Sequence, residues 1–569
     1  MSKWYRMSSL HRGFVTLMAS ASLFAGQLAS QSPGSQSPVG PPTQPPVGRP
    51  SGSGTQAPEQ SKPESESKAE THITPDEAKQ LFGLVDQLIK FSSQETGLPI
   101  KSEVKRQLTT RTAVEKYLKE KFEDDEDSRR MQRSEIVLKK FGLLDRDFDL
   151  KPFLLALLKE QIAAYYDPKE KAVNLLDWVS IEEQKPVLAH ELTHALQDQH
   201  VSLDKWGDQT PSDVSRTSSQ DSEHLAKDEI DTARDAVTEG QATAVMMDNI
   251  LKPMGKSLVG DPEVVEIIKR NMNGSEDSPV LARAPLLLSE SLLFPYREGL
   301  SFEQDVWMDR GQGAAFTGAL DRPPTSTWEI MNPREYEQGH VPSVPYLPDI
   351  HPLLDATYRP YDIGQVGELD VQILANLFSG EKASRDLTPA WDGGIYWAGQ
   401  KLSATAAEQA TTKSIAFFYL SVWKNEKSAE AFANLYADEL GRKYSGVKLD
   451  NAATKTSDPS AGGTEKVWNT NEGPVVITQK GKLVFVAESF DLPVARKLTT
   501  LILAAQGSGP LQNASTRPWA GDPSVVGGSL HPATLSGPLV RFMSNCGVTK
   551  AVVDAALQGT RSMTYPSFR

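Results

Sequence analysis

The stretch Val187-Leu-Ala-His190-Glu191-Leu-Thr-His194-Ala-Leu-Gln-Asp198-Gln-His200 contains three of the nine histidines in this 569-residue chain. The residues next to the first two histidines are uncharged and no proline interrupts them, so we expect a helix over residues 186–199. Residues four apart share one face of a helix, so His190 and His194 can both reach one ion. Glu191 stands beside them, where it can act on a water bound to that ion. The stretch therefore predicts a metal-binding helix.

The choice of metal follows from the chemistry that this helix can support. Zn²⁺ held by three protein ligands keeps one position open, lowers the pKa of its bound water toward neutrality and polarises a carbonyl group. An adjacent carboxylate then takes the proton and delivers it to the leaving amine. We therefore expect His190 and His194 as Zn²⁺ ligands and Glu191 as the general base and later acid.

The His-Glu-x-x-His pattern resembles the active-site helix of the zincin metallopeptidases. Two β-prone segments precede it, residues 163–166 and 172–176, and they predict a hairpin around Asp167-Pro168. The resemblance implies that a strand edge beside the helix pairs with an extended peptide substrate; an ordinary structural hairpin is the alternative. The longer motif, with Pro323-Pro324-Thr-Ser-Thr downstream, is also similar to a group of largely uncharacterised secreted prokaryotic proteins over about residues 150–340.

Two zincin patterns compete for the third metal ligand. His200 falls at the third histidine of the metzincin pattern, but that pattern needs a glycine where this chain has Gln197. Without that turn, a continuing helix rotates His200 by about 240° net, away from the metal. The gluzincin alternative takes a glutamate from a second helix. Glu239 is the favoured candidate because it lies in a small-residue, apolar stretch, 235–247, where an acid is costly without a partner. Glu223 stays open as a lesser alternative.

Further residues of the site are less well defined by spacing. A ligating imidazole usually donates its other N–H to a carboxylate, for which Asp198 and Asp235 are candidates. The thermolysin-like pattern has an aspartate four residues after the glutamate ligand, where this chain has Thr243. Candidates for stabilising a tetrahedral oxyanion are Tyr165, His224 and Tyr296.

The amino-acid composition limits the kinds of binding partner and metal site that the chain can have. The chain has 60 Lys and Arg against 74 Asp and Glu, a net charge of −14, and no basic cluster, so we expect no nucleic-acid partner. Its single cysteine, Cys546, excludes an internal disulfide framework and a cysteine-held zinc site, so His, Asp or Glu must hold the metal. We expect a protein or peptide substrate, and the sequence leaves the oligomeric state open.

The amino terminus has the layout of a cleaved secretory signal peptide over residues 1–30. Basic residues precede an apolar run over residues 13–25, and small residues follow it. The run is too short to cross a bilayer comfortably, and no other long apolar run follows. We therefore expect a secreted or periplasmic, cell-envelope protein without a membrane span.

The rest of the chain divides by composition and periodicity into four parts. Residues 31–72 are rich in Pro, Ser and Gly and are expected to be a disordered linker. We expect a mainly helical, zincin-like metallopeptidase domain with a short β-hairpin over residues 73–345. A smaller accessory α+β domain follows over 346–506, and a disordered tail over 507–569. The fold class expected is thus α+β.

Together these features predict a secreted zinc-dependent metallopeptidase that hydrolyses peptide bonds with a metal-activated water. One alternative is a non-catalytic zincin-like protein with a binding or structural role in the cell envelope, although the intact Glu191 argues against it. Another is zinc-dependent hydrolysis of a non-peptide amide or ester, because a fold is a weak guide to substrate.

Overall fold

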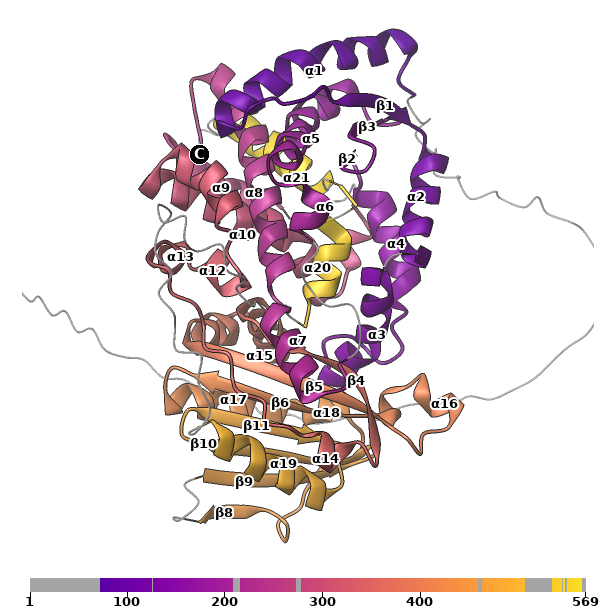
Figure 1. Cartoon of the computed structure of the whole chain (residues 1–569), viewed down its shortest axis with the longest axis vertical. Coiled ribbons are helices and arrows are strands. Elements are labelled where there is room, and N and C mark those ends of the chain that lie inside the picture. The colour runs from indigo at the N-terminus through magenta and orange to yellow at the C-terminus, as the bar shows by residue number, and fades with distance from the viewer. Residues whose placement is uncertain are drawn as a thin grey trace, which may run out of the picture. The chain divides into compact units, whose positions relative to one another are not determined.

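The computed structural model describes residues 72–124, 126–207, 215–272, 278–458, 463–506, 535–544, 546–547 and 550–564. All of these residues belong to one compact unit that begins at Ala69 (Figure 1). The expected signal peptide lies outside the described residues, and so do residues 31–71 of the expected linker and residues 507–534 of the expected tail.

Three long helices form the centre of the helical part: α5 (Ile181–Val201), α8 (Ile230–Leu251) and α10 (Leu286–Arg310). Helix α8 packs against both of the others, and α1 (Pro75–Thr96) packs against α5. Helix α5 begins earlier than the expected start at residue 186, because Ser180 caps it by accepting a hydrogen bond from the Glu183 backbone N–H. Its middle, which carries the two histidines, is buried.

Shorter elements surround these three helices. They are α2 (Arg111–Asp124), α3 (Glu126–Phe141), α4 (Leu150–Gln161), α6 (Leu203–Trp206), α7 (Ser218–Lys227), α9 (Glu263–Asn271), α11 (Ala319–Asp321), α12 (Thr327–Met331), α13 (Pro333–Gln338), the 3₁₀ turns η1 (Lys252–Met254) and η2 (Leu281–Arg283), and the π-helical turn η3 (Ala314–Gly318).

A small sheet lies beside α5. The expected hairpin is confirmed as β2 (Ala164–Asp167) and β3 (Ala172–Leu176), which pair antiparallel. Asp167 shapes its turn by accepting hydrogen bonds from the backbone N–H groups of Lys169 and Glu170. A third strand, β1 (Lys105–Thr109), pairs parallel to β3, so β3 is central and β2 is an edge strand. Strand β1 was not expected, because its largely exposed residues show no apolar alternation.

The second sheet has eight strands in the order β4-β5-β6-β11-β10-β9-β7, with β8 paired to β9, and its pairings are antiparallel. The strands are β4 (Tyr358–Gln365), β5 (Trp391–Lys401), β6 (Ile415–Trp423), β7 (Lys448–Leu449), β8 (Lys455–Asp458), β9 (Gly463–Thr470), β10 (Gly473–Lys480) and β11 (Leu483–Glu488). The helices and turns of this part are α14 (His351–Leu354), α15 (Glu368–Leu387), η4 (Thr388–Ala390), α16 (Ala406–Gln409), η5 (Thr412–Ser414), α17 (Glu426–Asp438), α18 (Leu440–Lys443) and α19 (Leu492–Ala505).

This larger sheet is apolar on both faces. In β6, Phe417 and Tyr419 join the core that is shared with the helical part, whereas Phe418 and Leu420 join a second core on the α19 side. Helix α3 reaches the shared core directly, since the rings of Phe141 and Phe417 lie 4.5 Å apart. The α+β class is therefore confirmed. The residues after 345 belong to the same compact unit as the helical part.

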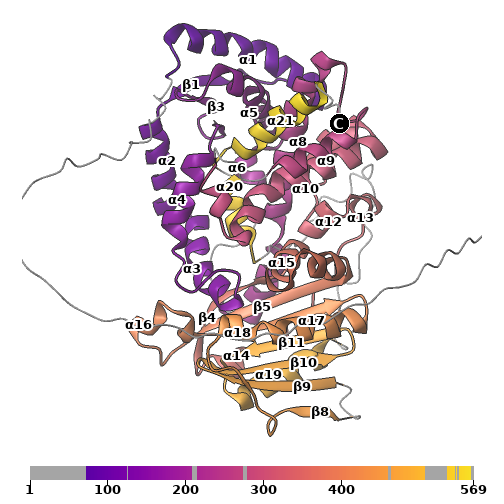
Figure 2. The same cartoon turned by 180° about the vertical axis from the view of Figure 1, so that it is seen from behind.

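The expectation of a disordered tail is wrong for two segments of the carboxyl terminus. Residues Gly537–Ser544 form α20 and Lys550–Thr564 form α21 (Figure 2). Helix α20 packs against α3, α8 and α10, where its apolar side chains are fully buried. Asp370 holds its start by accepting hydrogen bonds from the backbone N–H groups of Leu535 and Ser536. The eight residues of α20 leave a weak periodic signal, and the overall composition of the tail was misleading for the 15-residue α21 as well.

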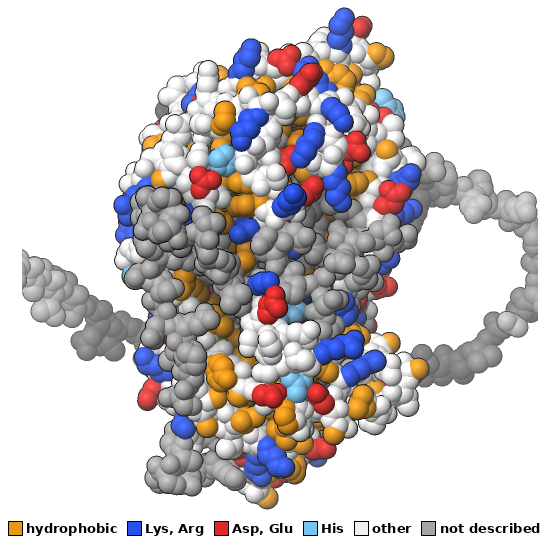
Figure 3. All heavy atoms as spheres, viewed as in Figure 1, with side chains coloured by type: hydrophobic (Ala, Val, Ile, Leu, Met, Phe, Trp, Pro, Cys, Tyr) orange, Lys and Arg blue, Asp and Glu red, His pale blue; other side chains and the backbone are white. Residues whose placement is uncertain are grey.

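The described surface is mixed in charge. On the face shown in Figure 3, Lys and Arg side chains are interspersed with Asp and Glu. Within the described ranges, no helix combines the length and the apolar character that a membrane crossing requires.

Helices α8 and α10 approach each other at a contact that glycine makes possible. A Cβ atom added to Gly240 would lie 2.3 Å from the Gly299 carbonyl oxygen, and one added to Gly299 would lie 2.1 Å from the Ala236 carbonyl oxygen. The two backbones therefore touch. Gly240 directly follows Glu239 in α8. The close packing at Gly240 therefore affects how deeply the Glu239 side chain is buried.

We predict that Gly240→Ala lowers the free energy of unfolding by about 1–3 kcal/mol, because the added methyl group must push two helix backbones apart. Urea denaturation measures the change. The matched control is Gly83→Ala in α1, where the added Cβ meets nothing within 4 Å; it should be neutral or stabilising by up to about 1 kcal/mol. Equal effects of the two substitutions would contradict the close crossing.

Candidate metal centre

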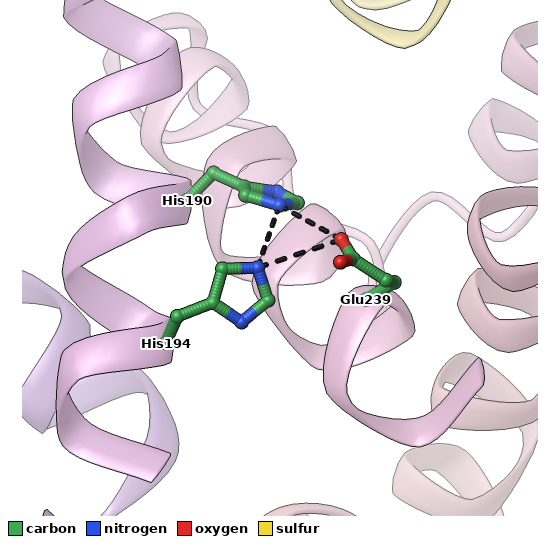
Figure 4. A group of neighbouring side chains, drawn as sticks. All are labelled: His190, His194 and Glu239. Carbon is green, nitrogen blue, oxygen red and sulfur yellow. Dashed lines mark hydrogen bonds and ion pairs between the residues drawn. The ribbon is translucent and has the colours of Figure 1, made fainter. Parts of the chain in front are cut away.

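Helices α5 and α8 bring three donor atoms to one point (Figure 4). The Nε2 atoms of His190 and His194 are 3.0 Å apart. Glu239 Oε2 lies 3.0 Å from His190 Nε2 and 3.4 Å from His194 Nε2. The structure thus brings together the three residues expected as ligands, and theirs is the one group of this kind found among the described residues.

The separations of these atoms fit a metal site. Ligands bound at 2.0–2.1 Å in a tetrahedron lie about 3.3 Å from one another. A simple buried ion pair would require one short contact between His190 and Glu239. Here a third donor, from His194, converges on the same point, and all three residues are buried. Two imidazole nitrogens and a carboxylate oxygen are a donor set that suits a divalent transition metal.

The three residues of the group shift one another's pKa strongly. Burial favours the neutral form of Glu239, but His194 and His190 outweigh it and lower the glutamate pKa to about 2. Burial likewise opposes a charge on His194, yet Glu239 raises the pKa of His194 to about 9. The pKa of His190 is lowered because burial outweighs its contact with Glu239. Without a metal, the group therefore holds one positive and one negative charge.

The partner of His194 differs from the expected one. Its Nδ1 lies 2.8 Å from Gln197 Oε1. Asp198 instead ties α5 to the hairpin, accepting hydrogen bonds from the Tyr166 hydroxyl at 2.8 Å and the Lys171 ammonium at 2.7 Å. Sequence reasoning missed Gln197 because it looked for a carboxylate. The available signal was its position three residues after His194, on the same helix face.

The two alternative third ligands lie elsewhere. His200 Nε2 is 2.8 Å from Asp321 Oδ1, at the carboxyl-terminal end of α5. Glu223 is exposed and pairs with Lys227 at 2.7 Å. Because α5 runs unbroken to Val201, His200 is turned away from the group as the helix geometry required.

Glu191 and Tyr296 border the group. Glu239 is the main cause of the raised pKa of His194, and burial is the main cause for Tyr296. The fully buried Glu191 adds a smaller contribution to both, so it lies close to both side chains. The Tyr296 ring lies 6.3 Å from that of His190, centroid to centroid. Burial raises the tyrosine pKa well above its ordinary value, so the hydroxyl keeps its proton. Tyr165, by contrast, stacks on Tyr117 at 4.7 Å.

The carboxyl-terminal segment reaches this region. The Tyr296 hydroxyl donates a hydrogen bond to the Gly547 carbonyl oxygen at 3.3 Å. A Cβ atom added to Gly547 would lie 2.2 Å from the Ala164 carbonyl oxygen. Gly547 therefore lies directly against the edge strand β2 at Ala164, on the strand that the zincin resemblance assigns to substrate.

Comparisons of the chain with protein-family models, with curated proteins and with solved structures find no match. The interpretation of this site therefore depends on its own geometry and on the sequence motif.

His224, a candidate for oxyanion stabilisation, belongs to a different buried cluster. Its Nε2 lies 3.8 Å from Asp228 Oδ1. Burial, with the nearby charges of Arg130 and Arg133, lowers the His224 pKa to about 2. The imidazole is thus neutral in the folded protein at any ordinary pH.

We predict that His224 makes the protein less stable in acid. Below pH 6.5 the unfolded chain binds a proton at this histidine, whereas the folded chain does not until about pH 2. The free energy of unfolding should therefore fall by up to about 1.4 kcal/mol per pH unit below 6.5. Urea denaturation at pH 7.5 and 5.5 should show a smaller loss for His224→Gln than for the wild type. The same loss in both proteins would contradict this origin.

Proposed function

We propose that the protein is a secreted, zinc-dependent peptidase with a zincin-like catalytic region. His190, His194 and Glu239 hold the zinc, and Glu191 is the general base. The observation that carries the proposal is the convergence of two histidines from one helix and a glutamate from another, at separations of 3.0–3.4 Å. The proposed substrate is a protein or peptide, and secretion is inferred from residues 1–30.

Zinc and Glu191 have different roles in the proposed reaction. Bound zinc supplies a Lewis acid that polarises the scissile carbonyl and acidifies a water molecule. Glu191 takes a proton from the attacking water on its carboxylate and passes it to the leaving nitrogen. Its burial strengthens this role, because charges act more strongly where water is excluded. Tyr296 keeps its own proton, which it donates to the Gly547 carbonyl oxygen in this structure, so its hydroxyl could stabilise an oxyanion only after that contact breaks.

One observation favours the alternative of a non-catalytic zincin-like protein. His190 and Glu191 are both 0% exposed, and Gly547 covers β2 at Ala164. A protein in this state could hold a metal while giving a peptide little direct access to Glu191. Measuring metal content and hydrolysis side by side separates the two functions.

We predict that Glu191→Gln retains one zinc per chain and lowers hydrolysis of an unstructured protein substrate about 10²–10⁴-fold, because the proton acceptor is lost while the ligands remain. Metal analysis and a fluorescent casein assay measure the two effects. The control is Glu182→Gln, an exposed acid in the first turn of the same helix, which should change neither. Zinc binding without hydrolysis in the wild type would support the non-catalytic alternative.

We also predict that Glu239→Ala loses zinc, whereas His200→Ala keeps it. Removing Glu239 takes away one of three donors, but His200 binds Asp321 and not the group. Metal analysis after dialysis against a weak chelator makes the comparison. The proposed ligand set is wrong if Glu239→Ala keeps full metal while His200→Ala loses it.

A further inference from the structure

Gln197 makes a complete set of directed contacts behind His194. Its Oε1 faces His194 Nδ1 at 2.8 Å. Its Nε2 donates to the Thr238 carbonyl oxygen at 3.0 Å and to Gln241 Oε1 at 2.9 Å. The side chain is fully buried, so no water competes for these contacts.

Gln241 is fixed in the same way. Its Nε2 donates to the carbonyl oxygens of Ala315 and Phe316, each at 3.0 Å. Both carbonyls belong to the π-helical turn η3, whose wider winding departs from the regular helical hydrogen-bond ladder. A backbone carbonyl can only accept, so the amide nitrogen of Gln241 must face η3 and its oxygen must face Gln197.

The direction of the whole chain of hydrogen bonds follows from these carbonyls. Gln197 must turn its nitrogen toward Thr238 and Gln241, because both offer it acceptors. Its oxygen is then left for His194. An amide oxygen only accepts, so His194 must donate from Nδ1.

We propose that Gln197 is a positioning residue that keeps a proton on His194 Nδ1 and thereby reserves Nε2 for the metal, with Gln241 and η3 fixing the orientation of Gln197. This inference rests on the proposed metal site. A neutral amide performs the orienting task that a carboxylate often performs beside a metal-binding histidine.

A carboxylate could not replace this amide. In Gln197→Glu, the oxygen that replaces Nε2 would face the Thr238 carbonyl and Gln241 Oε1, both acceptors. Gln241 cannot turn to help, because it would lose both of its hydrogen bonds to η3. In many metal sites, the negative charge of a carboxylate strengthens the histidine ligand beside it. Here the charge of the new glutamate would face the oxygen atoms of Thr238 and Gln241.

The test compares Gln197→Met, Gln197→Glu and the control Gln199→Met, a glutamine two residues further along α5 whose contacts are with Lys101 and Ser102. Chelator competition measures the zinc dissociation constant. Nuclear magnetic resonance of protein labelled with ¹⁵N-histidine reports the Nδ1–H proton of His194, with and without zinc.

We expect Gln197→Met to weaken zinc binding about 10–100-fold and to lose the exchange-protected Nδ1–H resonance. Gln197→Glu should also weaken binding, and Gln199→Met should leave both readouts unchanged. Wild-type affinity in Gln197→Glu, or a retained resonance in Gln197→Met, overturns the inference. If Gln197→Met does not fold, the wild type decides, because zinc bound through Nδ1 overturns it as well. If the wild type binds no zinc but shows a protected Nδ1–H, the result refutes the proposed zinc-dependent function. It does not refute the role of Gln197 in holding the proton on Nδ1.

Discussion

The burial of the Glu239 carboxylate is the constraint on which the rest of the helical part depends. Burying a lone charge costs several kcal/mol, so its position is tolerable only with cationic or metal partners at contact distance. The two histidines of α5 meet that requirement, while α8 packs closely against α10 at Gly240 and Gly299. The His190–His194–Glu239 group, the small residues of α8 and the hydrogen bonds behind His194 are thus parts of one arrangement.

A buried ion pair also joins the helical part to the larger sheet. Lys140 of α3 bonds to Glu472 at 2.8 Å, beside the Lys443–Glu488 pair. Burial lowers the pKa of Lys140 to about 8, although Glu472 opposes that change. Removing Glu472 would leave the buried Lys140 ammonium without its carboxylate partner, so this contact helps to hold α3 against the part that carries the sheet. The pair thus contributes to the packing of both parts within one compact unit.

Local spacing predicted more than composition did. The helix with His190 and His194, the hairpin, and the second helix with Glu239 were predicted from periodicity and from the cost of placing an acid in an apolar setting. Both signals are visible within about a dozen residues. The pairing of β1 with β3, the contact of Gln197 with Gln241 and the burial of α20 join positions that are far apart in the chain. No local pattern encodes such contacts. The Gly- and Ser-rich composition after residue 506 was misleading because a few apolar side chains are enough to anchor an eight-residue helix.

The placement of α20 has a consequence for biosynthesis. A ribosome makes the chain from its amino terminus at about 5–20 residues per second, so α5, α8 and α10 emerge long before Gly537. Until then the surface of α8 and α10 that α20 covers is exposed, and the Tyr296 hydroxyl lacks its Gly547 acceptor. The surroundings of the His190–His194–Glu239 group are therefore complete only after Gly547 has been made. A product truncated before Gly537 would lack α20 and the Gly547 acceptor of Tyr296.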